Sequence, residues 1–278
     1  MWCKKILVAY DGSAPSHRAL EVMREIAAQN PAVEVVLVHV MRLFSSGSAA
    51  AGMDTVMVDD AMAIREELEA IAAVCTQADI YVISDEIYAC LTYDGRTFTS
   101  FASLSSDAKE RTILVNGVSK AYAMTGWRIG YACANDVIAK VMANYVSHST
   151  GSPVAISQRA AAVALSGSQA EIETMRQAFE QRRNYIVERM NAIPGVSCIQ
   201  PEGAFYVMMN LEQLLGKTIH GVEITNDDVF ADAFLKYGLV AVVPGSGFGA
   251  PNFVRWSYAT SMENIKEGLD RLEKFLAE

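Results

Sequence analysis

The 278-residue sequence lacks several features that define common classes of protein. Positive charge is scarce, because 23 lysines and arginines stand against 32 acidic residues, which gives a net charge of −9. Broad binding to nucleic acid requires a basic face, so we expect no nucleic-acid partner, although a single local anion site is compatible with this charge. No apolar run approaches the roughly 18 residues of a membrane-spanning helix, so we expect no membrane partner.

Cysteine and histidine are also scarce. The five cysteines lie far apart and form no C-x-x-C pair, which predicts reduced thiols and a cytoplasmic location. The four histidines are equally scattered, so a metal site has no local support. The N-terminal segment "MWCKKILVAYDGS" combines two lysines with an apolar stretch. Asp11 ends that stretch too early for the apolar core of a secretory signal.

The N-terminal pattern predicts one βαβ unit. Two apolar runs, at 4–10 and 33–40, flank a segment with helical spacing at 18–29, and strands joined in this way run parallel. A glycine-rich, small-residue segment at 43–54 predicts a linker. A further helix is expected at 59–75.

A second run of alternating elements follows. Apolar segments at 79–85, 111–117 and 127–134 predict strands, and helices are expected at 135–148 and 168–192. We expect the two N-terminal strands to join this sheet. After residue 195, short strands alternate with two helices, which is typical of α+β structure. The predicted fold is therefore α/β, a mainly parallel sheet with flanking helices, followed by a smaller C-terminal α+β domain.

Polar side chains lie where two predicted strands end. Asp85 ends one strand, and Ser119 and Lys120 follow the next, with Tyr88 and Arg128 close by in sequence. Because the carboxyl ends of neighbouring strands line the ligand crevice of α/β sheets, we expect these groups to converge on one pocket. Placement alone is more often explained by a structural salt bridge than by catalysis.

Other residues have simpler interpretations. Arg255 lies in "NFVRWSYA", an alternating strand in which a buried charge requires a partner such as a carboxylate. "GSGFG" at 245–249 is interpreted as a turn, because no βαβ frame surrounds it. Trp127 and Tyr131 are interpreted as packing residues.

Five motifs carry a resemblance to a known family: "YVISDEIYACLTYDG", "VNGVSKAYAMTGWRIGY", "PEGAFYVMMNL", "VVPGSGFG" and "FVRWSYATS". In this order, they resemble the fold-type I pyridoxal-phosphate enzymes, specifically the class I/II aminotransferases of the aspartate aminotransferase kind. The resemblance runs from about residue 64 to 278. It implies amino-group transfer between an amino acid and a 2-oxo acid, with pyridoxal 5′-phosphate as the cofactor.

The same resemblance implies a role for each matching residue. Lys120 would form the Schiff base with the cofactor and then move the substrate α-proton. Asp85 would pair with the pyridine nitrogen, and Tyr88 would donate a hydrogen bond to the ring oxygen. The phosphate would be held by Ser119 and Arg128. The substrate α-carboxylate would be bound by Arg255.

The front half of the family's large domain has no match in this sequence, including the loop with an "NPTG" motif. We therefore expect activity to be impaired by truncation. In family members, residues of that half cross a dimer interface to the partner's cofactor. The resemblance therefore keeps a homodimer as one alternative. Other chemistries of the same cofactor, such as β-elimination or decarboxylation, use the same lysine and aspartate and also stay open.

Residues 3–42 resemble instead the first βαβ of universal stress proteins, small α/β nucleotide-binding proteins. That resemblance would place Asp11 near a nucleotide, but the glycine-rich phosphate loop of that family is not found, so nucleotide binding is not expected. The sequence predicts a chimera with segments 1–62, 63–190 and 191–278, joined near 43–66. The alternative is a non-enzymatic α/β chimera or stress-type protein with a vestigial site.

Overall fold

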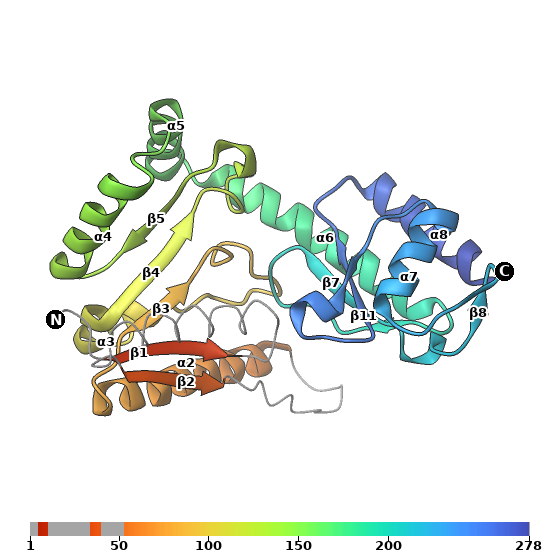
Figure 1. Cartoon of the computed structure of the whole chain (residues 1–278), viewed down its shortest axis with the longest axis horizontal. Helices are drawn as coiled ribbons and strands as arrows, with labels where there is room; N and C mark the ends of the chain where they lie inside the picture. Colours follow the sequence, from red (N-terminus) through yellow and green to blue (C-terminus); the bar gives the residue numbers. More distant parts are fainter. Residues whose placement is uncertain (1–4, 11–33, 40–52, 278) are drawn as a thin grey trace. The chain divides into compact units, whose positions relative to one another are not determined.

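The computed structural model describes residues 5–10, 34–39 and 53–277, and their side chains from residue 64 onward (Figure 1). The helix expected at 18–29 and most of the linker lie outside the described residues. From residue 53 onward the chain divides into two compact units, and the boundary between them lies between Thr174 and Met175. Each unit is described by itself below.

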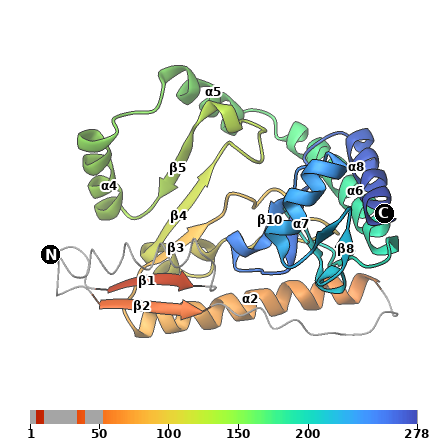
Figure 2. The same cartoon turned by 45° about the vertical axis from the view of Figure 1, so that its right-hand side comes forward.

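The N-terminal strands β1 (Lys5–Tyr10) and β2 (Glu34–His39) form a two-stranded sheet. Their arrows point the same way in Figures 1 and 2, as the βαβ pattern predicts. Within the described residues they pair only with each other, so the prediction that they join the next sheet is wrong. Backbone ladder bonds do not depend on side-chain identity, so an apolar strand pattern does not specify which sheet edge a strand will pair with.

The first unit has its core where helix α2 (Met53–Gln77) meets strand β3 (Val82–Asp85) and helix α3 (Ser106–Arg111). The buried members of this core are Cys75, Ile80, Val82, Phe101 and Ala108. A polar contact joins the two helices, because Asp107 accepts hydrogen bonds from Arg111 and, at 2.6 Å, from the Thr76 hydroxyl. These bonds, chiefly those from Arg111, lower the pKa of Asp107 to about 2.

The central sheet has the order β3–β4–β5, with β4 at Thr112–Gly117 and β5 at Gly130–Cys133. Strands β3 and β4 run parallel, but β5 runs antiparallel to β4, so this sheet is mixed. The reason lies in the connection, which contains one short 3₁₀ turn (Thr125–Trp127) and no crossover helix. The Met124 N–H donates to the Val118 carbonyl at 3.3 Å, which folds the loop back so that the chain returns beside β4.

Three helices follow the sheet: α4 (Asp136–Ser149), α5 (Ala155–Ser166) and α6 (Ala170–Ala192). Helix α4 begins where the Asn135 side chain accepts a hydrogen bond from the Ile138 N–H at 3.0 Å. Helix α5 was not predicted from the sequence. Helix α6 agrees closely with the helix expected at 168–192.

The second unit contains an antiparallel sheet of order β10–β11–β7–β6. Its core includes Phe230, Phe234, Trp256, Leu269 and Phe275, all buried. The fold is α/β with a smaller α+β part, as predicted. The elements of this part are β6 (Ser197–Cys198), β7 (Tyr206–Asn210), the hairpin β8 (Thr218–Ile219) and β9 (Val222–Glu223), α7 (Asp227–Ala233), β10 (Val243–Pro244), β11 (Phe253–Ser257) and α8 (Met262–Ala277).

Among the described residues, no helix combines the length and the apolar character that crossing a membrane requires.

Candidate active site

The carboxyl ends of β3 and β4 lie at one edge of the central sheet, because these two strands run parallel with Asp85 opposite Val115. The Glu86 N–H continues this pairing and donates to the Val115 carbonyl at 2.9 Å. Asp85 is exposed, and its Oδ1 accepts a hydrogen bond from the Ile87 N–H at 3.1 Å. The loop that follows β4 contains Lys120, so the aspartate and the lysine project from adjacent strand ends.

Tyr88 and Lys120 lie beside one another. The Lys120 Nζ is 5.6 Å from the centre of the Tyr88 ring. Two buried side chains, Val118 and Ala121, hold the loop on either side of Ser119 and Lys120. The loop therefore leaves the serine hydroxyl and the lysine amine partly accessible at the sheet edge.

Ser119 and Arg128 line one hollow of about 250 Å³, together with backbone from both strands. Arg128 was expected at the start of a strand, but it precedes β5 and has a left-handed backbone, with φ of 51°. This conformation costs a non-glycine residue about 1–2 kcal/mol. A hydrogen bond from Arg128 Nη1 to the Thr125 carbonyl, at 3.0 Å, stabilises the turn. Such strain is found preferentially at functional sites.

Two glycines form the wall of this hollow. Gly117 and Gly130 are paired directly across β4 and β5. A Cβ atom on Gly117 would lie 3.1 Å from both the Gly130 Cα and the Ile129 carbonyl oxygen. The absence of side chains here allows the two strands to approach closely and leaves backbone facing the hollow.

Arg255 lies in the second unit, on β11. Its guanidinium carbon is 4.0 Å from the centre of the Phe248 ring and 4.3 Å from the centre of the Tyr206 ring. Tyr206 pairs with Ser257 across β7 and β11, so it is the diagonal neighbour of Arg255. Rings stabilise a guanidinium through its faces and leave its N–H edge for a planar anion. The sequence did not identify Phe248 and Tyr206 as partners of this arginine.

The Phe248 ring belongs to a turn that Asp227 organises. The "GSGFG" segment forms a 3₁₀ helix (Gly245–Phe248) between two antiparallel strands. Asp227 is buried and accepts hydrogen bonds from the Ser246 N–H at 2.7 Å and the Asn252 N–H at 3.3 Å. Burial on its own would raise the pKa of Asp227, but hydrogen bonds from the backbone and side chain of Ser246, from its own backbone and from the backbone of Asn252 outweigh it and hold the pKa below its ordinary value.

Two aromatic residues near the site differ from expectation. Trp127 and Tyr131 were interpreted as packing residues, but 45% of Trp127 and 38% of Tyr131 are exposed. Trp127 instead lines an apolar hollow of about 620 Å³ with Met124 and residues of α5. An aromatic side chain in an apolar stretch predicts burial only when another element covers it.

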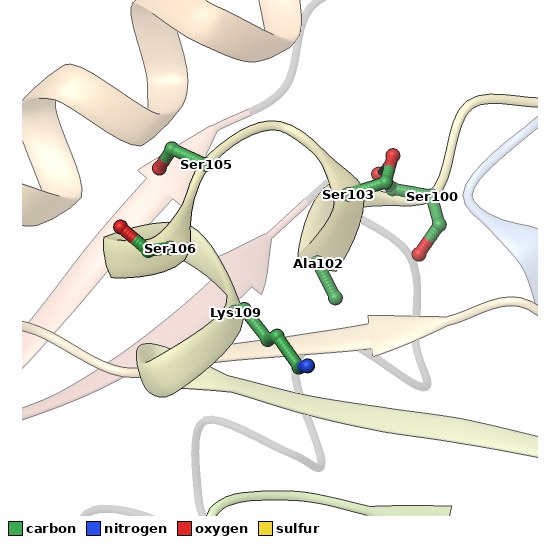
Figure 3. Close-up of a pocket in the computed structure, with 6 residues that line it drawn as sticks. All are labelled: Ser100, Ala102, Ser103, Ser105, Ser106 and Lys109. Atoms are coloured by element: carbon green, nitrogen blue, oxygen red, sulfur yellow. Dashed lines mark hydrogen bonds between the residues drawn. The ribbon is translucent and has the colours of Figure 1, made fainter.

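A serine-rich hollow of about 560 Å³ lies elsewhere in the first unit (Figure 3). Its hydroxyl groups have local uses, because Ser105 accepts a bond from the Ala108 N–H and Ser103 donates to the Ser100 carbonyl. Figure 3 shows Ser105 and Ser106 pointing away from Ser100. The hydroxyls therefore do not converge on a common ligand.

The fold and the site together define an α/β protein with a lysine, a tyrosine and an aspartate at one sheet edge, next to a hollow lined by Ser119 and Arg128. Comparison with known proteins identifies its family. The model for aminotransferase class I and II matches residues 61–272, and the chain belongs to this family.

Several relatives are similar over most of this chain. The aspartate aminotransferase of Bacillus subtilis is 46% identical over 215 residues, which cover 77% of this chain and 54% of the relative. The asparagine–oxo-acid transaminase of Streptococcus mutans is 42% identical over 212 residues, covering 76% and 53%. The crystal structure of the aspartate aminotransferase from Rhizobium meliloti superposes with a TM-score of 0.76 at 33% identity, covering 99% of this chain and 71% of that one.

These matches have two further features. The chain spans about half the length of the curated relatives it matches. In addition, residues 3–96 match the model of the universal stress protein family, so residues 61–96 match both families. The predicted likeness of the N-terminal segment to stress proteins is therefore confirmed.

Proposed function

We propose that this chain binds pyridoxal 5′-phosphate and transfers an amino group between an amino acid and a 2-oxo acid. The observation that supports this most directly is the position of the Lys120 amine beside the Tyr88 ring, at the sheet edge where β3 ends in Asp85. Family membership supports the same conclusion.

The residues at this edge fit the cofactor chemically. The hollow beside Ser119 and Arg128 offers a hydroxyl and a guanidinium, which suit a phosphate. Asp85 is exposed and can face a protonated pyridine nitrogen. When bound, the cofactor supplies an aldehyde for an amino group and a ring that accepts the electrons of a carbanion.

Each residue then has a definite task. With the cofactor bound, Lys120 would supply the amine for its aldehyde and would then move the proton at the substrate α-carbon. The Tyr88 hydroxyl would donate a hydrogen bond to the ring oxygen of the cofactor. Arg255 binds the substrate α-carboxylate, and the rings of Tyr206 and Phe248 restrict the rotation of its guanidinium.

We also propose that turnover is weak. The match to the aspartate aminotransferase of Bacillus subtilis covers 54% of that relative. The residues in the remaining part of the relative have no counterpart in this match. Catalysis is sensitive to position, since a displacement of about 1 Å can lower a rate by ~100-fold. The four cysteines that lie within the described residues are all free thiols, and on this ground we propose a cytoplasmic location.

The experiment that tests this function is reduction of the cofactor adduct. The chain is incubated with pyridoxal phosphate, treated with borohydride, and the modified peptide is identified by mass spectrometry. We expect the adduct on Lys120, its loss in Lys120→Ala, and its retention in Lys140→Ala, which removes an exposed lysine of α4. An adduct spread over surface lysines, or none, would favour the non-enzymatic alternative.

We further propose that the chain forms a homodimer through α4 and α5. These helices expose large apolar side chains, and Val137, Tyr145 and Ile156 each expose 72% of their surface. Exposed apolar patches of this kind mark interaction sites. Sedimentation velocity should give a dimer that Ile156→Asp dissociates, whereas Ile199→Asp, at an exposed site in the second unit, should not. A monomer at every concentration tested would contradict this proposal.

A further inference from the structure

Glu86 is a buried carboxylate immediately after Asp85. It is 5% exposed, although a charged group is costly to remove from water unless hydrogen bonds compensate it. Its Oε1 accepts two such bonds, from the Ser84 hydroxyl at 3.1 Å and from the Ser100 hydroxyl at 2.8 Å. We refer to Ser84, Glu86 and Ser100 as the Glu86 cluster.

The cluster lies on the opposite side of the chain from the Asp85 carboxylate. Successive side chains along extended backbone point to opposite faces, so Ser84 and Glu86 share one face and Asp85 projects from the other. The Glu86 N–H is bonded to the Val115 carbonyl, so both backbone and side chain of this residue are held. The direction of Asp85 is thereby coupled to the contacts of its neighbour.

The second hydroxyl comes from a distant segment. Ser100 precedes the 3₁₀ helix Phe101–Ser103, as Figure 3 shows. Its bond to Glu86 closes the intervening chain, which contains Tyr88 and the fully buried side chains of Leu91 and Tyr93. The cluster therefore holds the chain at a point between two candidate cofactor contacts, Asp85 and Tyr88.

We propose that Glu86 is a positioning residue, which acts through Ser84 and Ser100 to set the direction of Asp85 and the start of the turn that contains Tyr88. This inference rests on the proposed function, because it concerns how the cofactor contacts are held. Glu86 itself is buried and bonded to Ser84 and Ser100, so its role is exerted through these neighbours. Its oxygen serves as an acceptor for two hydroxyl donors, a task that a carboxamide oxygen can perform and an aliphatic side chain cannot.

The first experiment uses the chain without cofactor and measures amide hydrogen exchange at Ile87. The Ile87 N–H donates to Asp85 Oδ1, so its protection reports the direction of the Asp85 side chain. We expect Glu86→Leu to speed exchange at Ile87 at least 10-fold and Glu86→Gln to change it less than 3-fold. The Ile138 N–H, held by Asn135, serves as the reference amide and should keep its rate. Equal acceleration at both amides, or no change at Ile87, would overturn the proposal.

The second experiment is a double-mutant cycle on pyridoxal phosphate affinity, measured by absorbance titration. Glu86→Leu should weaken binding about 10-fold in the parent chain, and by less than 3-fold when Asp85→Ala is already present, because residues that act through one another are not additive. Glu110→Leu, which removes an exposed carboxylate of α3, is the matched control. The same loss in both backgrounds would contradict positioning through Asp85. A parent chain that binds no cofactor would refute the proposed function, and the Ile87 exchange result would still decide the role of Glu86.

Discussion

Replacement of Asp227 by asparagine should loosen the turn that holds Phe248 over Arg255. The Asp227 carboxylate accepts one backbone hydrogen bond from Ser246 and one from Asn252, on either side of this turn. Asparagine has nearly the same size but only one acceptor oxygen. One of the two backbone N–H groups would therefore face an amide NH₂ group in a buried site.

The size of the effect follows from these two bonds. A hydrogen bond to a charged group contributes about 1.5–3 kcal/mol, whereas a neutral one contributes about 0.5–1.5 kcal/mol. The 2.7 Å bond would become neutral, and the longer 3.3 Å bond would be lost, leaving a buried donor at a cost of about 1–3 kcal/mol. We expect Asp227→Asn to lower the free energy of unfolding of the second unit by about 2–4 kcal/mol.

The effect should depend on pH in a defined direction. The pKa of Asp227 in the folded chain lies below its ordinary value of 3.8, so the folded state favours the charged carboxylate. A depressed folded pKa contributes stability that is present above the unfolded pKa and is lost as the pH falls through the folded pKa. The difference in the free energy of unfolding between the parent chain and Asp227→Asn should therefore be constant near pH 7 and become smaller below about pH 4.

The assay is urea denaturation followed by the fluorescence of Trp256, which is buried in the second unit. The other tryptophans, Trp2 and Trp127, are first replaced by phenylalanine so that the signal reports this unit alone. Asp228→Asn, at the exposed neighbouring position of α7, is the control and should cost less than about 0.5 kcal/mol. A similarly small cost for Asp227→Asn, or a cost that persists unchanged at pH 3, would refute the reasoning.

Two further predictions concern the same turn. Gly245→Ala should lower the free energy of unfolding by about 1–3 kcal/mol or more in the same assay, because its Cβ would lie 2.4 Å from the Ala250 carbonyl oxygen. Gly247→Ala, where a Cβ meets nothing within 4 Å, is the control, and equal costs would contradict the steric explanation. Phe248→Leu should weaken substrate binding to the protein with its cofactor bound, because one cation–π contact, which contributes about 0.5–2 kcal/mol, is lost. The weaker binding should appear as a higher KM. An unchanged KM would show that the ring does not orient Arg255.

The sequence predicted those parts of the site that depend on local pattern. Apolar runs ending in polar residues predicted β3 and β4 and therefore the positions of Asp85 and Lys120 at strand ends. Alternation predicted β11 and the position of Arg255 within it. Both patterns follow from the two-residue period of extended backbone, which a single segment is enough to reveal.

Features that depend on contacts between distant segments could not be predicted in the same way. The antiparallel direction of β5 follows from how its preceding loop folds back, and an apolar run has the same appearance in either direction. Glu86 resembles any charged residue beside an aspartate until Ser100, 14 positions later, is known to cover it. Phe248 and Arg255 come together only because β10, the turn and β11 form one antiparallel unit.

The overlap of two family patterns over residues 61–96 has the same physical origin. We expected the stress-protein likeness to end near residues 43–66, but the match to that family continues to residue 96, past Asp85. In this chain residues 61–96 contain the end of helix α2 and the strand β3, and such a local pattern specifies an αβ unit without specifying its neighbours. In this chain the neighbour of β3 is β4, with Asp85 opposite Val115. This pairing brings the end of β3 beside the loop that contains Lys120 and, more than the identity of β3 itself, places Asp85 at the candidate site.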